Sequence, residues 1–180
     1  MATAFDRCMG VVFNAEGGYS NHPNDRGGRT NYGLTAGFLE SIGYGKTPEE
    51  ITQEEARELY QKHFWAPVQA DELPGPVALI VFDMAVNSGV KTAVRRLQYV
   101  LNNYKAMDLD GAMGPKTLAA TQSAYHRYSN IFLGELLNSR REYYADLIRK
   151  NPSQGVFAQG WNNRLNKLLV AVVANNWTGY

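Results

Sequence analysis

The chain has 180 residues, of which 44% are hydrophobic and 19% are charged, which is the composition of one soluble globular domain with room for a small appended subdomain. A formal net charge of +1 excludes the strongly basic surface that is typical of nucleic-acid-binding proteins. One cysteine, Cys8, excludes an internal disulfide, and the three histidines are too scattered to predict a metal site.

No stretch of the sequence predicts a targeting or membrane segment. The first seven residues, MATAFDR, lack the basic and apolar regions of a signal peptide. The longest apolar stretch, residues 77–86, is too short to span a bilayer and contains Asp83. We therefore expect a protein made in the bacterial cytoplasm without membrane insertion, which something else must carry to any substrate outside.

The first predicted element is a helix over residues 5–13 that carries a carboxylate just beyond it. Its apolar residues share one face: Phe5, Cys8, Met9, Val12 and Phe13. We expect Cys8 on this face to be a small buried hydrophobic residue. Glu16 lies three residues after Phe13 on this face, and Gly17 and Gly18 then end the helix. Partial burial and the negative end of the helix dipole would both raise the pKa of Glu16, which suits a general acid; a tolerated surface glutamate is the other interpretation.

An irregular loop rich in glycine follows Glu16 and reaches to Thr35. Asp25 comes nine positions after Glu16, and Thr30 five positions after Asp25. A protonated acid, a second carboxylate and a hydroxyl together can protonate a leaving oxygen and position a water molecule.

The following segments predict three capped helices and one buried helix. Thr35 can cap a short helix, and capping boxes begin at Thr47 and Thr52, the second opening a helix over residues 53–65. Residues 76–87 are apolar on every side and predict a central buried helix. Asp83 and Asn87 lie on one stripe of it, either as a polar pair in the core or facing a cleft; we favour a cleft position for Asn87, since it ends the helix.

The C-terminal half predicts further helices over residues 90–104, 130–150 with Ser129 as its cap, and 157–177. Between the first two, the segment with Asp108 and Asp110 does not fit a calcium loop and predicts a turn in which Pro115 opens a helix. The predicted fold is mainly α, with at most a short hairpin within residues 19–34.

These residues resemble two families of cell-wall hydrolases. Glu16, Asp25 and Thr30 resemble the Glu, Asp and Thr of phage lysozymes of the T4 type, although four residues separate Asp25 from Thr30 here instead of five. The closer resemblance is to glycoside hydrolase family 108, the N-acetylmuramidases with an EGGY motif. It covers nearly the whole chain, with EGGY at 16–19, DRGGRT at 25–30, YGLT at 32–35, DELP at 71–74, FDMAVNSG at 82–89, LQ at 97–98, DGAMGPKTLAA at 110–120 and GWNNR at 160–164.

The resemblance implies a lysozyme-like helical fold with a short irregular or β-hairpin catalytic loop. It implies a catalytic region over residues 1–89 and a helical, peptidoglycan-binding-like subdomain over 90–180 packed on it. The implied activity is hydrolysis of the β-1,4 bond between N-acetylmuramic acid and N-acetylglucosamine, without a cofactor or metal. The implied site residues are Glu16, Asp25 and Thr30 for catalysis, with Tyr19, Asn31, Tyr32 and Asn87 for substrate binding.

Several alternatives remain open from the sequence. Tyr19 and Tyr32 either pack on sugar faces or only pack the loop. A lytic transglycosylase would need one acid and no water, which Asp25 argues against. A non-catalytic peptidoglycan-binding protein would have no reason to keep Glu16. A phage endolysin that a holin releases, a prophage product and a wall-remodelling enzyme that a secretion system exports all fit the sequence.

Overall fold

The computed structural model describes residues 2–16 and 30–174, and within these ranges the fold is mainly α, as predicted. The chain forms two compact units, Met1–His63 and Phe64–Tyr180. The boundary between these units falls between His63 and Phe64, not at residue 89. The predicted division into a catalytic region and a binding subdomain therefore differs from the division into units, and it stays a prediction.

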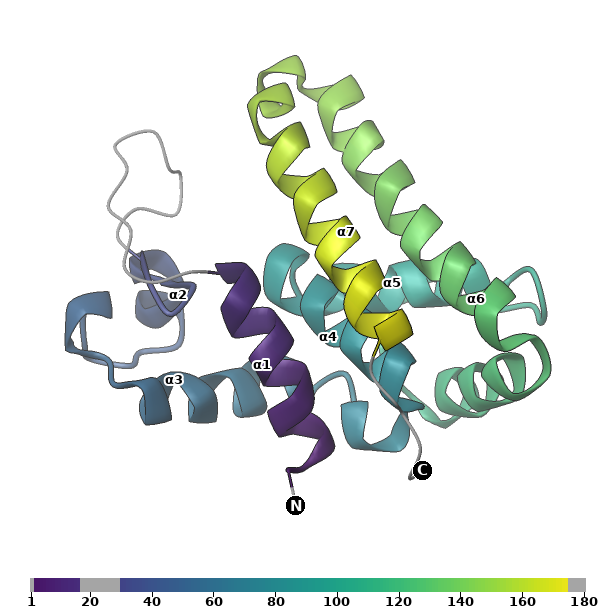
Figure 1. Ribbon diagram of the computed structural model, residues 1–180, viewed down its shortest axis with the longest axis horizontal. Coiled ribbons are helices and arrows are strands. Elements are labelled where there is room, and N and C mark those ends of the chain that lie inside the picture. Colours follow the sequence, from purple (N-terminus) through teal and green to yellow (C-terminus); the bar gives the residue numbers. More distant parts are fainter. Residues whose placement is uncertain (1, 17–29, 175–180) are drawn as a thin grey trace. The chain divides into compact units, whose positions relative to one another are not determined.

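The first unit begins with the predicted helix, α1 (Ala4–Glu16), which is drawn in purple in Figure 1. The apolar face is buried as the spacing predicts, and Cys8 has no exposed surface. Burial raises the pKa of the Cys8 thiol to about 12, so this cysteine is a packed hydrophobe at neutral pH. At the start of α1, Asp6 accepts hydrogen bonds from Thr3 and pairs with Arg57.

A two-stranded antiparallel hairpin follows, made of β1 (Thr30–Asn31) and β2 (Leu34–Thr35). The register places Thr30 opposite Thr35 and Asn31 opposite Leu34. Thr35 also caps α2 (Ala36–Ser41), since its hydroxyl accepts a hydrogen bond from the amide of Phe38 at 3.0 Å. The short hairpin is therefore continuous with the helix that the sequence predicted after Thr35.

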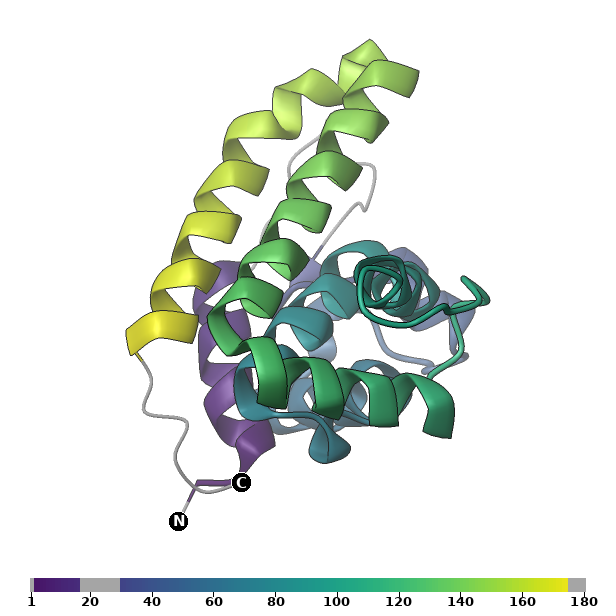
Figure 2. The same cartoon turned by 90° about the vertical axis from the view of Figure 1, so that its right-hand side faces the viewer.

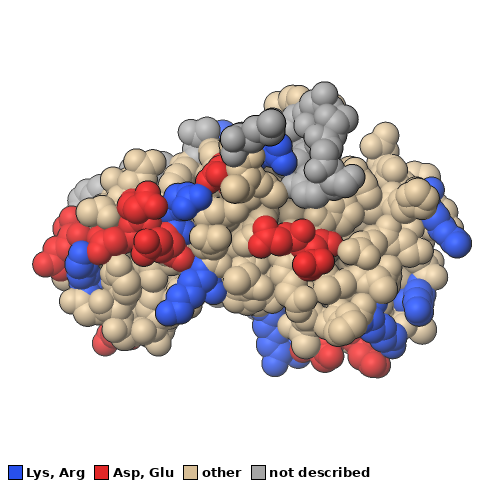
Figure 3. All heavy atoms as spheres, turned by 90° about the horizontal axis from the view of Figure 1, so that it is seen from below, with Lys and Arg blue, Asp and Glu red and all other residues tan. Residues whose placement is uncertain are grey.

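Both predicted capping boxes are present. The box at Thr47 opens a 3-10 turn, η1 (Pro48–Glu50), and the box at Thr52 opens α3 (Gln53–Tyr60). The predicted helix over residues 53–65 ends in a π-helical turn, η2 (Gln61–Trp65). Acidic side chains gather over the exposed surface of η1 and α3 (Figure 3), while Ala56, Leu59 and Tyr60 face the core. This charged surface is a solvated helix face.

The second unit surrounds the central helix α4 (Gly75–Ser88), which is buried on all sides from Gly75 to Ala85. A 3-10 turn, η3 (Ala70–Glu72), precedes it, and α5 (Val90–Leu101) packs against it. The long α6 (Pro115–Lys150), the 3-10 helix η4 (Pro152–Phe157) and α7 (Ala158–Ala174) complete the unit. In Figures 1 and 2 the second half of α6 lies beside α7 as an antiparallel pair.

The turn before α6 is held by one glutamine. Gln98, buried on α5, donates to the Asp110 carboxylate at 2.7 Å and accepts from the amide of Gly111 at 2.9 Å. Gly111 has a φ of 76°, and a Cβ there would lie 2.9 Å from the carbonyl oxygen of Lys91, so only glycine fits. Asp110 is thus a turn residue, in agreement with the interpretation that excluded a calcium loop.

The predicted role of Ser129 as a helix cap is wrong. A cap side chain accepts a hydrogen bond from the turn that follows it, whereas the Ser129 hydroxyl donates to the preceding carbonyl of Tyr125 at 3.1 Å. The backbone of Ser129 has φ 24° and ψ −99°, which bends α6 and is visible as the change of direction in Figure 2. The predicted helix over residues 130–150 is therefore present as the second segment of α6, and Ser129 lies at the kink between the two segments.

Candidate functional site

Glu16 is the last residue of α1, which agrees with its predicted place in the last turn of a helix. Its side chain lies outside the part of the chain that the structure describes, and so do Tyr19 and Asp25. The described part of the candidate site consists of the hairpin that follows the loop and of the elements that hold this hairpin.

Asn31 fastens the hairpin to the turn of η1. Its Nδ2 donates to the carbonyl of Pro48 at 3.0 Å and, more weakly, to that of Ile51 at 3.5 Å. Thr30 lies next to it in β1, paired with Thr35 across the hairpin. Both residues are half-buried, so β1 has a fixed place in the first unit.

Tyr32 forms the hairpin turn in an unfavourable backbone conformation. Its φ is 51° and that of Gly33 is 76°, and a two-residue turn with positive φ at both positions matches the twist of the strands. A tyrosine in this region is strained, and the strain is supported by its surroundings. The Tyr60 hydroxyl donates to the Tyr32 carbonyl at 2.9 Å, and the Phe13 ring lies 6.1 Å from the Tyr32 ring, centroid to centroid.

Phe13 links this turn to the end of α1. Its ring also meets Tyr60 edge to face, at 5.6 Å and 88°. Phe13 lies three positions before Glu16, the last residue of α1. The structure thus brings the end of α1 and the strand with Thr30 into one corner of the first unit.

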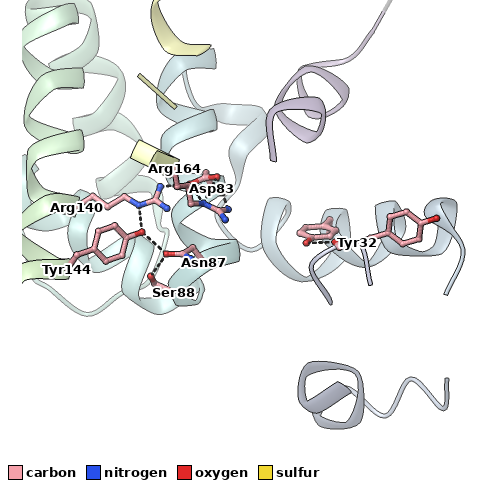
Figure 4. Close-up of polar contacts among 8 residues, drawn as sticks. Tyr32, Asp83, Asn87, Ser88, Arg140, Tyr144 and Arg164 are labelled. Carbon is pink, nitrogen blue, oxygen red and sulfur yellow. Dashed lines mark hydrogen bonds and ion pairs between the residues drawn. The ribbon is translucent and has the colours of Figure 1, made fainter. Parts of the chain in front are cut away.

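Asn87 lies in the second unit, in the last turn of α4, and is exposed. Its Oδ1 accepts a hydrogen bond from the Tyr144 hydroxyl at 2.6 Å and a longer one from Ser88 at 3.3 Å (Figure 4). The sequence left open whether Asp83 and Asn87 are a polar pair in the core or face a cleft. Asp83 lies in the core, since only 1% of its surface is exposed. Asn87 is at the surface of the unit.

Asp83 is the centre of a buried ion cluster that the sequence did not reveal. It pairs with Arg140 of α6, and Arg164 of α7 donates to both of its carboxylate oxygens at 3.0 Å (Figure 4). Burial would raise the pKa of Asp83, but the two guanidinium groups outweigh burial and hold this pKa below its ordinary value. The motifs at 82–89 and 160–164 contain Asp83 and Arg164, but neither motif gives a partner for these residues.

Within the described residues, no group of three or more His, Cys, Asp or Glu side chains could hold a metal ion. The helices described for residues 2–16 and 30–174 include none that is both long enough and apolar enough to cross a bilayer.

Comparisons with known proteins give a consistent result. Residues 9–89 match the family described as "Glycosyl hydrolase 108", and residues 92–166 match the family described as "Predicted Peptidoglycan domain". Among solved structures, "Structure of Brucella abortus SagA" is similar over 94% of each chain, with 31% sequence identity and a TM-score of 0.79. A search of curated proteins gave no match. The similarity supports a lysozyme-like, mainly α fold.

Proposed function

Because the chain belongs to the glycosyl hydrolase 108 family and is a peptidoglycan hydrolase of the N-acetylmuramidase type, we propose that Glu16 is its general acid. Glu16 donates a proton to the oxygen of the β-1,4 bond between N-acetylmuramic acid and N-acetylglucosamine. Asp25 takes the proton of the attacking water, and Thr30 helps to hold that water.

The observation that supports this assignment is the connection between the end of α1 and the hairpin. Phe13, three residues before Glu16, packs on Tyr32, two residues after Thr30. The loop that contains Asp25 starts at one of these points and ends at the other. An acid and a water-holding hydroxyl must keep a fixed separation to act on one bond, and the Phe13–Tyr32 contact supports the proposal because it links the two ends of this loop.

The chemistry follows the inverting route. Water attacks the anomeric carbon as the bond from this carbon to the glycosidic oxygen breaks. The leaving oxygen receives the proton of Glu16, and the water loses a proton to Asp25. Such enzymes keep their two carboxyl groups roughly 6.5–9.5 Å apart, which leaves room for the water.

Four residues are proposed to bind the glycan, and all of them lie inside the stretch that matches the hydrolase family. Tyr19 and Tyr32 offer aromatic rings to the apolar faces of sugars. Asn31 keeps its Oδ1 for the glycan while its Nδ2 holds the hairpin. Asn87 offers an exposed amide at the end of α4.

Peptidoglycan lies outside the cytoplasmic membrane, so an enzyme made in the cytoplasm needs a route to it. We propose that the enzyme acts as an endolysin of a phage or prophage and that a holin releases it; an export system for wall remodelling is the alternative. Lysis of cells that express the enzyme only when a holin is expressed with it supports the first route. Lysis without a holin would contradict it.

The catalytic assignment is tested by zymography on embedded cell walls. Glu16→Gln keeps the shape of the side chain but cannot donate the proton, so clearing should fall by about 10²–10⁴-fold. The matched control is Glu40→Gln, an exposed glutamate on α2 of the same unit, which should clear like the parent chain. Wild-type clearing by a folded Glu16→Gln variant would show that another group is the acid.

A further inference from the structure

The Tyr144 hydroxyl lies between an arginine and the exposed amide of Asn87. Tyr144, on α6, is buried, and its ring stacks on Trp161 of α7 with 4.6 Å between centroids and 10° between planes. The Nε of Arg140 donates to the Tyr144 oxygen at 2.8 Å, and the Tyr144 hydroxyl contacts the Asn87 Oδ1 at 2.6 Å. Figure 4 shows this chain of contacts from α6 to the end of α4.

The direction of each hydrogen bond in this chain is determined by the groups themselves. An arginine side chain has donors only, so the Tyr144 oxygen must accept from Arg140. The hydroxyl has one proton, and it is left to point at Asn87. Burial raises the pKa of Tyr144, so the hydroxyl keeps this proton at neutral pH.

The amide of Asn87 is therefore fixed in one of its two flip states. Because the Tyr144 proton needs an acceptor, the Asn87 oxygen must face Tyr144, and Ser88 donates to the same oxygen. The Nδ2 then points away from Tyr144, and it has no hydrogen-bond partner among residues 30–174. Asn87 thus presents two N–H donors at the surface of the second unit.

The anchor of this chain is the buried ion cluster. Arg140 has no exposed surface and is paired with Asp83, which Arg164 holds from α7. Side chains from α4, α6 and α7 therefore hold the Arg140 guanidinium in place, and this guanidinium donates to the Tyr144 oxygen.

We propose that Tyr144 is a positioning residue for substrate binding, which holds the Asn87 amide so that its N–H groups donate to an acceptor oxygen of the glycan. This inference rests on the proposed function of Asn87. Tyr144 and Arg140 lie within residues 92–166, whereas Asn87 lies within residues 9–89. A residue of the stretch that matches the peptidoglycan domain, Tyr144, thereby orients a proposed binding residue of the stretch that matches the hydrolase, Asn87.

The experiment must distinguish positioning of Asn87 from a purely structural role, in which Tyr144 only connects α6 to α4. The full chain is compared as wild type, Tyr144→Phe, Asn87→Asp, Asn87→Ala and the double variant Tyr144→Phe with Asn87→Ala. KM and kcat are measured on a soluble, uncross-linked glycan fragment, and the melting temperature is measured in parallel. Tyr144→Phe keeps the ring that stacks on Trp161, and Asn87→Asp keeps an oxygen for the Tyr144 proton but has no N–H to donate.

Positioning predicts that Asn87→Ala and Asn87→Asp raise KM about fivefold and Tyr144→Phe about threefold, with kcat within about twofold of wild type. The double variant should have the KM of Asn87→Ala, since Tyr144 acts only through Asn87. Additive effects on KM, a wild-type KM for Asn87→Asp, or a change in melting temperature with no change in KM would each overturn the proposal. Glu16→Gln in the same assay reports on the proposed function alone, so the two failures are distinguishable.

Discussion

The Tyr60 hydroxyl, at the end of α3, donates a hydrogen bond of 2.9 Å to the backbone carbonyl of Tyr32 in the hairpin turn. Tyr60 has no exposed surface, so this bond is shielded from water. It supports a residue whose left-handed backbone conformation is unfavourable by itself. The hairpin beside the end of α1 is thus held by side chains that come from outside the hairpin.

Tyr60→Phe should loosen this turn without changing the packing of the ring. Loss of one buried hydrogen bond costs about 1 kcal/mol, which lowers the melting temperature of a chain of this size by about 2–4 °C. Hydrogen exchange should accelerate at the hairpin amides and remain unchanged in α5. Unchanged exchange at Asn31 and Leu34 would show that the hairpin does not depend on Tyr60.

Asp83→Asn should be among the most destabilising single changes in the second unit. It removes the buried carboxylate that pairs with Arg140 and Arg164, and breaking a buried ion pair such as Asp83–Arg140 costs about 3–5 kcal/mol. The control is Asp71→Asn, an exposed residue of η3. Urea unfolding measures both; a loss below about 1 kcal/mol for Asp83→Asn would mean that the cluster is not a stabilising unit.

Glu55 makes the first unit sensitive to acid. The hydrogen bond from Lys46, followed by that from the Thr52 amide, lowers the pKa of Glu55 from 4.5 to about 2. A lowered pKa in the folded state means that the stabilisation is complete above pH 4.5 and is lost as the pH falls towards 2.

Glu55→Gln should therefore reduce the dependence of the melting temperature on pH between about 4.5 and 2. The matched control is Glu54→Gln, its exposed neighbour, which should keep the full dependence. Identical pH profiles for wild type and Glu55→Gln would contradict the assignment.

Much of the fold could be predicted because its signals are local. Thr35 and Thr52 each accept from the amide three residues ahead, and Thr47 and Glu50 form their capping box over the same spacing. The apolar spacing of α1 and α4 reports the burial of these helices directly. Local signals also misled, since Ser129 resembles a cap but lies at a kink inside α6.

What could not be predicted depends on residues far apart in the chain. Asp83 finds Arg140 57 positions away and Arg164 81 positions away, and no spacing rule links them. The orientation of the Asn87 amide depends on Tyr144, which is also 57 positions away. The exposure of Asn87 could be predicted from its place at the end of the helix, but the group that orients its amide could not.

The catalytic roles that we propose for Asp25 and Thr30 predict different losses of rate. Asp25→Ala removes the base that activates the water and should lower kcat by about 10²–10⁴-fold. Thr30→Ala removes one hydrogen bond to the water and should lower kcat about tenfold or less. Single-turnover rates on a soluble glycan measure both variants; an Asp25→Ala variant within about threefold of wild type would exclude Asp25 as the base.

The most direct test is the configuration of the first product, followed by NMR during hydrolysis of a β-linked glycan fragment. If Glu16 protonates the leaving oxygen while a water held by Asp25 and Thr30 attacks from the opposite face, the first reducing ends are the α-anomer and convert slowly to the equilibrium mixture. Reducing ends that form first as the β-anomer would show retention, through a covalent glycosyl-enzyme intermediate that water then hydrolyses. Ends of the 1,6-anhydro type would show that no water attacks, and either result would contradict the proposed mechanism.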